Sequence, residues 1–259
     1  MAINSKVKSE IIKILVDTVE AKLREYKPET QYAPFHHGLI GKDKYAMFSF
    51  IQSINTTFGM SIWEQVAVIL ARGANFEAQR QFDLLGNIDS ETEAVIRKMH
   101  HELRAGSIVT NKGNEIKTIK QIIKNGVAKN DPDSRVDFLV KTKNIENYFD
   151  ITSVKPNMKE FVSLKLKLLR WTALRLSIDK KANVFTRVAI PYNPYFPDSY
   201  ERWTLKGLYD LEAGEIFVGE EFWNFVAGDN VYEDLIKAFN NAGKKLRPKL
   251  DKKFSEFSN

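Results

Sequence analysis

The sequence contains no cysteine, and it has no long apolar segment. Without cysteine the chain can form neither a disulfide nor a thiolate metal site, and nothing in it indicates an oxidising compartment. The first residues, up to Leu23, form an amphipathic pattern that lacks the uninterrupted apolar core of a signal peptide or membrane span. We therefore expect a cytoplasmic protein with no membrane partner.

Several common catalytic patterns are also missing. There is no glycine-rich loop that would cradle a phosphate, and no serine, histidine and aspartate pattern rises above chance. The histidines occur as the adjacent pairs His36-His37 and His100-His101. Because adjacent side chains diverge on a helix or strand, these pairs do not predict a metal site.

The composition predicts one globular domain with a polyanionic partner. A chain of 259 residues with 43% hydrophobic residues can bury a sizeable core. We expect a helical part over about 1–125, an α/β core over about 126–191 and a helical, aromatic part over about 192–259. The net charge of +6 favours a nucleic-acid partner, although many basic proteins bind nothing acidic. The basic tail 244–259 could be a phosphate-contacting arm or a solvated, frayed end.

Two apolar stretches, 135–140 and 148–155, predict paired strands that each carry an acid. The acids are Asp137 and Asp150, and Lys155 ends the second stretch. The polar residues 141–147 between them are typical of a hairpin loop, so the two carboxylates can converge. Two converging carboxylates beside a lysine indicate a divalent metal ion and a water to be activated.

A strand, helix and strand follow the hairpin. Asn157 and Glu160 have the spacing of a capping box, which predicts a helix to about Leu176, and 182–190 predicts a strand that Pro191 ends. This order predicts a right-handed crossover with parallel strands. On the helix we expect Phe161, Leu164, Leu168 and Leu169 on the buried side, and Lys159, Lys167 and Arg170 on the polar side.

These residues and this order resemble the PD-(D/E)xK nuclease superfamily. The resemblance implies an α/β fold with a central mixed sheet flanked by helices, and a site made of an Asp on one strand and an acid with a lysine on the next. The dipeptide Pro132-Asp133 matches the motif literally but falls in a predicted loop, so we assign the metal-binding role to Asp137.

The sequence departs from the motif at Thr152, where the pattern expects a lysine. A second register, Ser153-Val154-Lys155, matches a serine variant in which an acid on the next helix, here Glu160, completes the site. Strand alternation puts Asp150 and Lys155 on opposite faces, so they can cooperate only if the strand ends or bulges first.

The rest of the chain is mostly helical. Glu64 has two interpretations: with Ser61 it fits a capping box, and in the superfamily a helix before the strands often donates an acid to the metal. A short strand is expected at 107–110. The predicted helices before the hairpin are 5–26, 42–55, 61–72, 90–103 and 114–124, and those after the crossover are near 200–211, 220–226 and 231–242.

The aromatic, proline-containing segment after Pro191 offers groups that stack on bases and bind phosphates. Candidate DNA contacts are Asn193, Tyr195, Arg202 and Lys206. The alternative is a packed aromatic loop with Arg202 stacked on a ring.

Longer strings of sequence resemble a narrower family, the TdeIII-like type II restriction endonucleases, over about residues 10 to 243. The family resemblance implies the palindrome GGNCC. We expect Mg²⁺-dependent cleavage of double-stranded DNA, in which Asp137 and Asp150 hold the metal, Glu64 assists directly or through a water, and Lys155 orients the attacking water. A target with twofold symmetry calls for a homodimer. The alternatives are a DNA-binding protein on a degenerate nuclease fold, suggested by Thr152, and a repair nuclease that recognises DNA structure. The matching strings are Pro34-Phe35-His36, Phe48-Ser49-Phe50-Ile51-Gln52-Ser53, Asn55-Thr56-Thr57-Phe58-Gly59, Asp150-Ile151, Lys155-Pro156-Asn157, Ile190-Pro191-Tyr192-Asn193-Pro194-Tyr195, Tyr200-Glu201-Arg202-Trp203 and Glu221-Phe222-Trp223.

Overall fold

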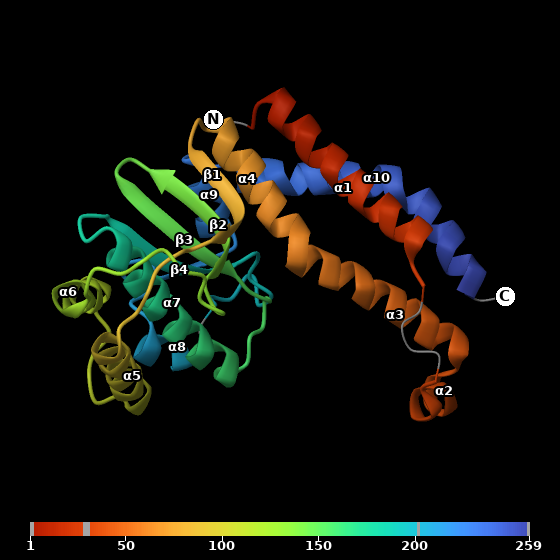
Figure 1. The fold of residues 1–259 in the computed structure, drawn as a ribbon. Coiled ribbons are helices and arrows are strands. Elements are labelled where there is room, and N and C mark those ends of the chain that lie inside the picture. The colour runs from red at the N-terminus through yellow and green to blue at the C-terminus, as the bar shows by residue number, and fades with distance from the viewer. Residues whose placement is uncertain (1–2, 28–31, 201–202, 258–259) are drawn as a thin grey trace. The chain divides into compact units, whose positions relative to one another are not determined.

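A computed structural model describes residues 3–27, 32–200 and 203–257 (Figure 1). The chain divides into two compact units, one formed by Met1–Ile69 with Asn230–Asn259 and the other by Leu70–Asp229. The strands and the acids Asp137 and Asp150 belong to the second unit. Whether the chain acts as one domain stays a prediction.

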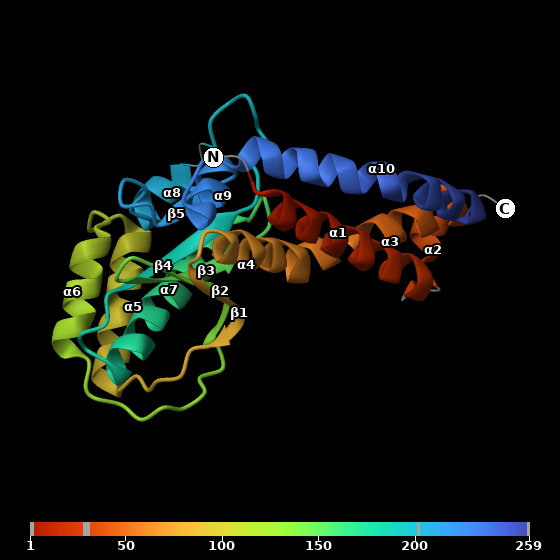
Figure 2. The same ribbon diagram turned by 90° about the horizontal axis from the view of Figure 1, so that it is seen from above.

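The first unit is helical. Its helices are α1 (Ser5–Glu25), α2 (Pro34–Ile40), α3 (Lys42–Thr57), a π-helical turn (Phe58–Ile62), most of α4 (Trp63–Gly73), and α10 (Tyr232–Phe257). Helices α1 and α10 lie side by side and run in the same direction, as Figures 1 and 2 show. Apolar residues such as Ile11 and Leu15 of α1 and Leu235 and Leu246 of α10 are buried.

The second unit is built on a mixed five-stranded sheet in the order β1-β2-β3-β4-β5. The pairs β1-β2 and β2-β3 are antiparallel, and β3-β4 and β4-β5 are parallel. The parallel pair β3-β4 is joined by α7, which confirms the predicted crossover. The strands are β1 (Glu77–Asp83), β2 (Arg135–Thr142), β3 (Ile145–Ile151), β4 (Val184–Ile190) and β5 (Ile216–Val218).

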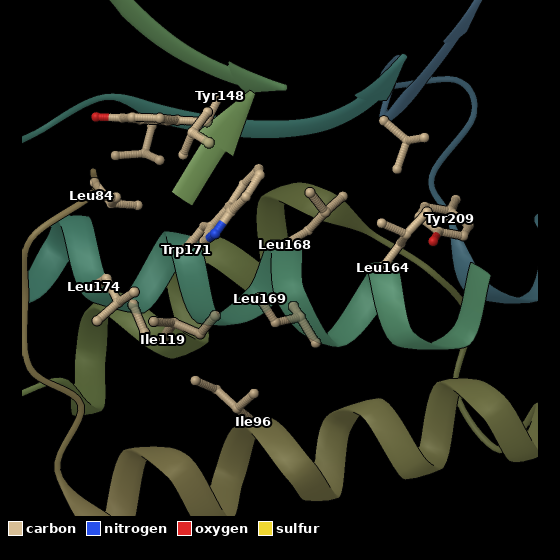
Figure 3. Packing of buried hydrophobic residues seen from close by; sticks show 14 of the residues in the cluster. Leu84, Ile96, Ile119, Tyr148, Leu164, Leu168, Leu169, Trp171, Leu174 and Tyr209 are labelled. Atoms are coloured by element: carbon tan, nitrogen blue, oxygen red, sulfur yellow. The ribbon is translucent and has the colours of Figure 1, made fainter. Parts of the chain in front are cut away.

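Helix α7 lies between the sheet and α5 (Figure 3). Trp171 and Leu168 point from α7 toward the strands, and Leu169 points to the other side, toward Ile96 of α5. The buried-side residues predicted from periodicity are all buried. The helices of this unit are α5 (Ser90–Ala105), α6 (Lys112–Ile122), α7 (Met158–Ile178), α8 (Trp203–Leu208) and α9 (Glu220–Ala227).

The opposite face of the sheet is covered by aromatic rings. Phe138 and Phe149 of β2 and β3 contact Phe222 of α9 at ring-centroid distances of 6.4 and 5.4 Å. Burial on both faces explains why the strands read as nearly continuous apolar runs. An acid in such a run therefore lies close to the end of the sheet or meets a cation.

The structure corrects several predicted boundaries. Residues 107–110 form no strand. The first strand is β1, and its only large apolar residue is Phe82. The predicted loop 141–147 is wrong, since Thr142 pairs with Ile145 and the strands extend almost to the turn. Polar residues fill these edge positions, which hides the strands from a search for apolar alternation.

The basic tail is not frayed over its described residues, because α10 continues to Phe257 and Lys249 pairs with Glu20 of α1 at 2.5 Å. Lys249 is 56% exposed, and the role of the tail as a phosphate-contacting arm stays a prediction. Among the described helices, none combines the length and apolarity needed to cross a bilayer.

Candidate active site

Asp137 and Asp150 converge at the end of the β2-β3 hairpin. The regular pairing of these strands stops at Phe138 and Phe149. Beyond it, the Asp137 Oδ2 atom accepts a hydrogen bond of 2.8 Å from the backbone N–H of Ile151, the residue after Asp150. The carboxylate of Asp137 thus lies at the peptide bond that follows Asp150, as the hairpin interpretation requires.

Asp150 forms an ion pair with a lysine of α7 that was not predicted from the sequence. Its Oδ2 atom lies 2.6 Å from Nζ of Lys167 on α7. The Asp150 side chain is 9% exposed and that of Lys167 is 30% exposed. The ammonium of Lys167 also lies 4.9 Å from the ring centroid of Trp171, one turn further along α7. Lys167 is thus half-buried and ion-paired rather than fully solvated on the polar side of this helix.

Thr152 faces the start of the same helix. Its Oγ1 donates a hydrogen bond of 2.9 Å to Oε1 of Glu160, whose backbone N–H is capped by Asn157 at 3.0 Å. This confirms the predicted cap. Glu160 is therefore held beside the position where the common motif has a lysine.

Lys155 lies apart from the two acids. Strand β3 ends at Ile151, so the condition for Lys155 to turn toward Asp150 is met. Lys155 is nevertheless exposed, and its ammonium lies 5.1 Å from the ring centroid of Tyr195. Among the described contacts, the Lys155 ammonium makes none with a carboxylate.

Glu64 is on α4 in the first unit, where its side chain is 2% exposed. The predicted helix start at Ser61 is wrong, because α3 continues through the π-helical turn into α4. Ser61 accepts a hydrogen bond of 2.6 Å at Oγ from Nε2 of Gln65 and lies inside helical structure. Glu64 therefore does not belong to a capping box with Ser61. The role of Glu64 as a metal ligand stays a prediction.

The candidate DNA contacts lie in the loop after β4. Asn193 shapes this loop: its Nδ2 donates to the carbonyl of Asp198 at 2.7 Å, and its Oδ1 accepts from the N–H of Tyr195 at 2.9 Å. The ring of Tyr195 lies 5.6 Å from that of Tyr200. Arg202 and the side chain of Lys206 lie outside the described residues. Tyr192 and Phe196 of this loop are exposed, and its contact with DNA stays a prediction.

The chemistry of these groups fits Mg²⁺. The described residues contain no group of three or more acids, histidines or cysteines that could hold a metal on its own. Mg²⁺ does not require such a group, because it commonly takes one or two carboxylates and completes its shell with waters and substrate phosphates. Asp137 and Asp150 supply that number of carboxylates.

A buried charge cluster lies beside this site and was missed from the sequence. Lys165 of α7 pairs at 2.8 Å with both Glu115 and Glu215, and Lys112 pairs with Glu215 at 2.8 Å and bonds Oγ1 of Thr186. Lys112, Lys165 and Glu215 are 0% exposed. Two ammonium and two carboxylate groups balance, so the cluster is a satisfied network that joins α6, α7, β4 and the residue before β5.

The cluster shifts its own pKa values. Burial alone would raise the pKa of Glu215, but the charges and hydrogen bonds of Lys112 and Lys165 outweigh it and lower the pKa. For Lys112 burial is the larger effect and lowers the pKa, and the Glu215 charge offsets only part of it. Burial, with the charges of Glu215 and Asp150, also raises the pKa of the neighbouring Tyr209.

The sequence matches a known family over most of its length. The model of a family described as "Type II restriction endonuclease, HinfI" matches residues 1–243. The chain is similar to the type II restriction enzyme HgiCII of Herpetosiphon aurantiacus, with 24% identity over 91% of this chain and 86% of that protein. It is also similar to MjaII of Methanocaldococcus jannaschii (22% identity, 96% of this chain and 72% of that protein) and to HgiEI of Herpetosiphon aurantiacus (22% identity, 86% and 85%).

Proposed function

Because this chain belongs to the HinfI family of type II restriction endonucleases and is a site-specific deoxyribonuclease, we propose that it hydrolyses double-stranded DNA at the β2-β3 hairpin in a Mg²⁺-dependent reaction. The observation that carries this proposal is the bond from the Asp137 carboxylate to the amide next to Asp150. It brings two carboxylates to one edge of the sheet, which is the arrangement that a PD-(D/E)xK nuclease site requires.

In this proposal Asp137 and Asp150 hold the metal ion, and Glu64 assists directly or through a water. When bound, Mg²⁺ supplies a Lewis acid for the phosphate and lowers the pKa of a water. The protein fixes the two carboxylates: the Ile151 amide orients Asp137, and the position of Asp150 on β3, beside parallel β4, limits its movement.

We further propose the specificity that the TdeIII-like resemblance implies, the palindrome GGNCC. A target with twofold symmetry is matched by a protein with twofold symmetry, so the active form is a homodimer. Base contacts are proposed for the loop of Asn193 and Tyr195 and for Arg202 and Lys206.

Digestion of a plasmid of known sequence, with and without Mg²⁺, tests the proposal. Discrete fragments that end at GGNCC sites, formed only with the metal, support it. A smear indicates a nuclease that recognises DNA structure. Intact DNA that shifts on a gel indicates a DNA-binding protein without catalysis.

Glu64→Gln tests the third ligand. Glutamine keeps the volume of this buried side chain and removes its charge, so we expect a cleavage rate lower by about 10- to 100-fold with an unchanged melting temperature. Glu10→Gln on the exposed side of α1 is the control. A lower melting temperature with a normal rate would instead make Glu64 a structural carboxylate.

A further inference from the structure

The ammonium group that the nuclease motif lacks at Thr152 is present at the site from another element. We propose that Lys167 of α7 supplies the catalytic lysine of this enzyme. It would place positive charge on the scissile phosphate beside Asp150. This inference rests on the proposed function and names a residue for it.

The first argument is direct contact. Of the lysines near the hairpin, Lys167 meets a proposed metal-binding carboxylate, at 2.6 Å from Asp150. Lys155 is exposed and lies over Tyr195. A lysine acts on the reacting phosphate only if it shares the position of the metal ligands. Lys167 has that position, and Lys155 would have to leave its ring contact to reach it.

The second argument concerns faces. Thr152 follows Asp150 by two residues, which is the same-face spacing along β3, and it bonds Glu160 of α7. Lys167 follows Glu160 by about two helical turns and so lies on the same side of α7. A lysine at position 152 and Lys167 of α7 would therefore lie on the same face of the hairpin.

The third argument is accessibility. The buried pair of Lys165 with Glu215 is 0% exposed on both sides, so it has no path to a phosphate. The Lys167 side chain is 30% exposed. The pair of Asp150 with Lys167 is therefore partly open to a phosphate, as expected for a functional pair rather than a core ion pair.

The fourth argument is preorganisation. Trp171 lies under the ammonium of Lys167, is itself fully buried, and donates from Nε1 to the carbonyl of Asp133 at 2.8 Å. Lys165, two residues before Lys167, pairs with Glu115 of α6 and with Glu215 in the loop before β5. The helix is thus fixed on both sides of the lysine. A fixed charge stabilises a transition state without reorganisation, which makes it more effective than a mobile one.

The chemistry balances without a further reactant. The water oxygen forms a bond to phosphorus as one phosphorus-oxygen ester bond breaks. One water proton leaves to solvent and the departing alkoxide oxygen takes a proton from solvent. Lys167 stays protonated throughout and offsets charge on the non-bridging oxygens.

The test compares Lys167→Met, Lys155→Met and Lys159→Met in single-turnover cleavage of a DNA fragment that the wild-type enzyme cuts. Methionine keeps most of the apolar stem and removes the charge. We expect Lys167→Met to lower the cleavage rate by at least about 100-fold. The loss of rate in Lys155→Met should be at least about tenfold smaller than the loss in Lys167→Met. Lys159, exposed on the first turn of the same helix, should leave the rate nearly unchanged.

Two further measurements separate catalysis from structure. Calorimetric titration with Mg²⁺ should show that Lys167→Met binds the metal at least as tightly as wild type, because the ammonium no longer competes for Asp150. Adding Thr152→Lys to Lys167→Met should recover at least about tenfold of the lost rate, since position 152 lies on the Asp150 face and a lysine there can still donate to Glu160.

The outcomes distinguish this inference from the proposed function. A wild-type enzyme that cuts no DNA with any divalent metal overturns the function itself. An enzyme that cuts while Lys167→Met retains a near-normal rate, or loses rate only together with metal binding and melting temperature, overturns the role of Lys167. An equal or larger loss in Lys155→Met does the same.

Discussion

Asp137→Asn and Asp150→Asn should each lower the single-turnover cleavage rate by more than about a thousandfold while binding to the target DNA remains measurable. Asparagine keeps the size of the side chain, and at position 137 its oxygen can still accept the Ile151 N–H. What each variant loses is a negatively charged metal ligand. Binding persists, because removing a carboxylate also removes repulsion of the DNA phosphates.

Asp133→Asn is the matched control. Asp133 belongs to the literal Pro-Asp dipeptide, is exposed in a loop and contributes its backbone carbonyl to Trp171. We expect this variant to cut normally. A near-normal rate in Asp137→Asn or Asp150→Asn would move the metal site elsewhere, and a large loss in Asp133→Asn would move it to the loop.

Local sequence patterns predicted the hairpin and the crossover. The runs around Asp137 and Asp150, the cap at Asn157 and the strand stop at Pro191 depend on neighbours within a few residues, so the sequence contains their causes. The same holds for the convergence of the two acids. Antiparallel pairing follows from a short polar connection, and the structure only moved the ends of the strands.

The sequence could not predict the partner of Asp150. Lys167 reaches it only because α7 packs with a particular rotation on the sheet, and that rotation depends on residues from α5, α6 and β5. On a helical wheel Lys167 resembles a solvated lysine. Contact between a strand and the middle of a following helix is a tertiary property that spacing alone does not give.

The buried charge cluster, in contrast, could have been found in part from the sequence. Lys165 falls on the apolar stripe of α7, four residues after Phe161 and three before Leu168, where a charge is costly unless it is paired. Lys112 and Glu115 likewise occupy the buried side of α6. A charged residue on a buried stripe predicts a buried partner, although the sequence does not say that the partner is Glu215.

Loss of the Glu215 charge should be among the most destabilising polar changes in the second unit. Glu215→Gln leaves Lys112 and Lys165, both 0% exposed, with only Glu115 as a counter-charge. Breaking a buried ion pair of this kind costs about 3–5 kcal/mol of stability. Denaturant unfolding measures this cost. Glu212→Gln, exposed in the same loop, is the control and should change stability by less than about 0.5 kcal/mol.

The acid dependence of unfolding tests the same cluster through its charge. The neighbouring lysines outweigh burial and hold the pKa of Glu215 below its ordinary value of 4.5, so its contribution to stability is complete above pH 4.5 and declines as the pH falls through the lowered pKa. The wild-type protein should therefore lose stability below about pH 4.5, and Glu215→Gln should lose less over that range because it lacks the titrating group. Equal acid profiles in the two proteins, or a cost no larger than that of Glu212→Gln, would mean that the cluster does not hold α7 in place. The fixed position of Lys167 beside Asp150 would then need another cause.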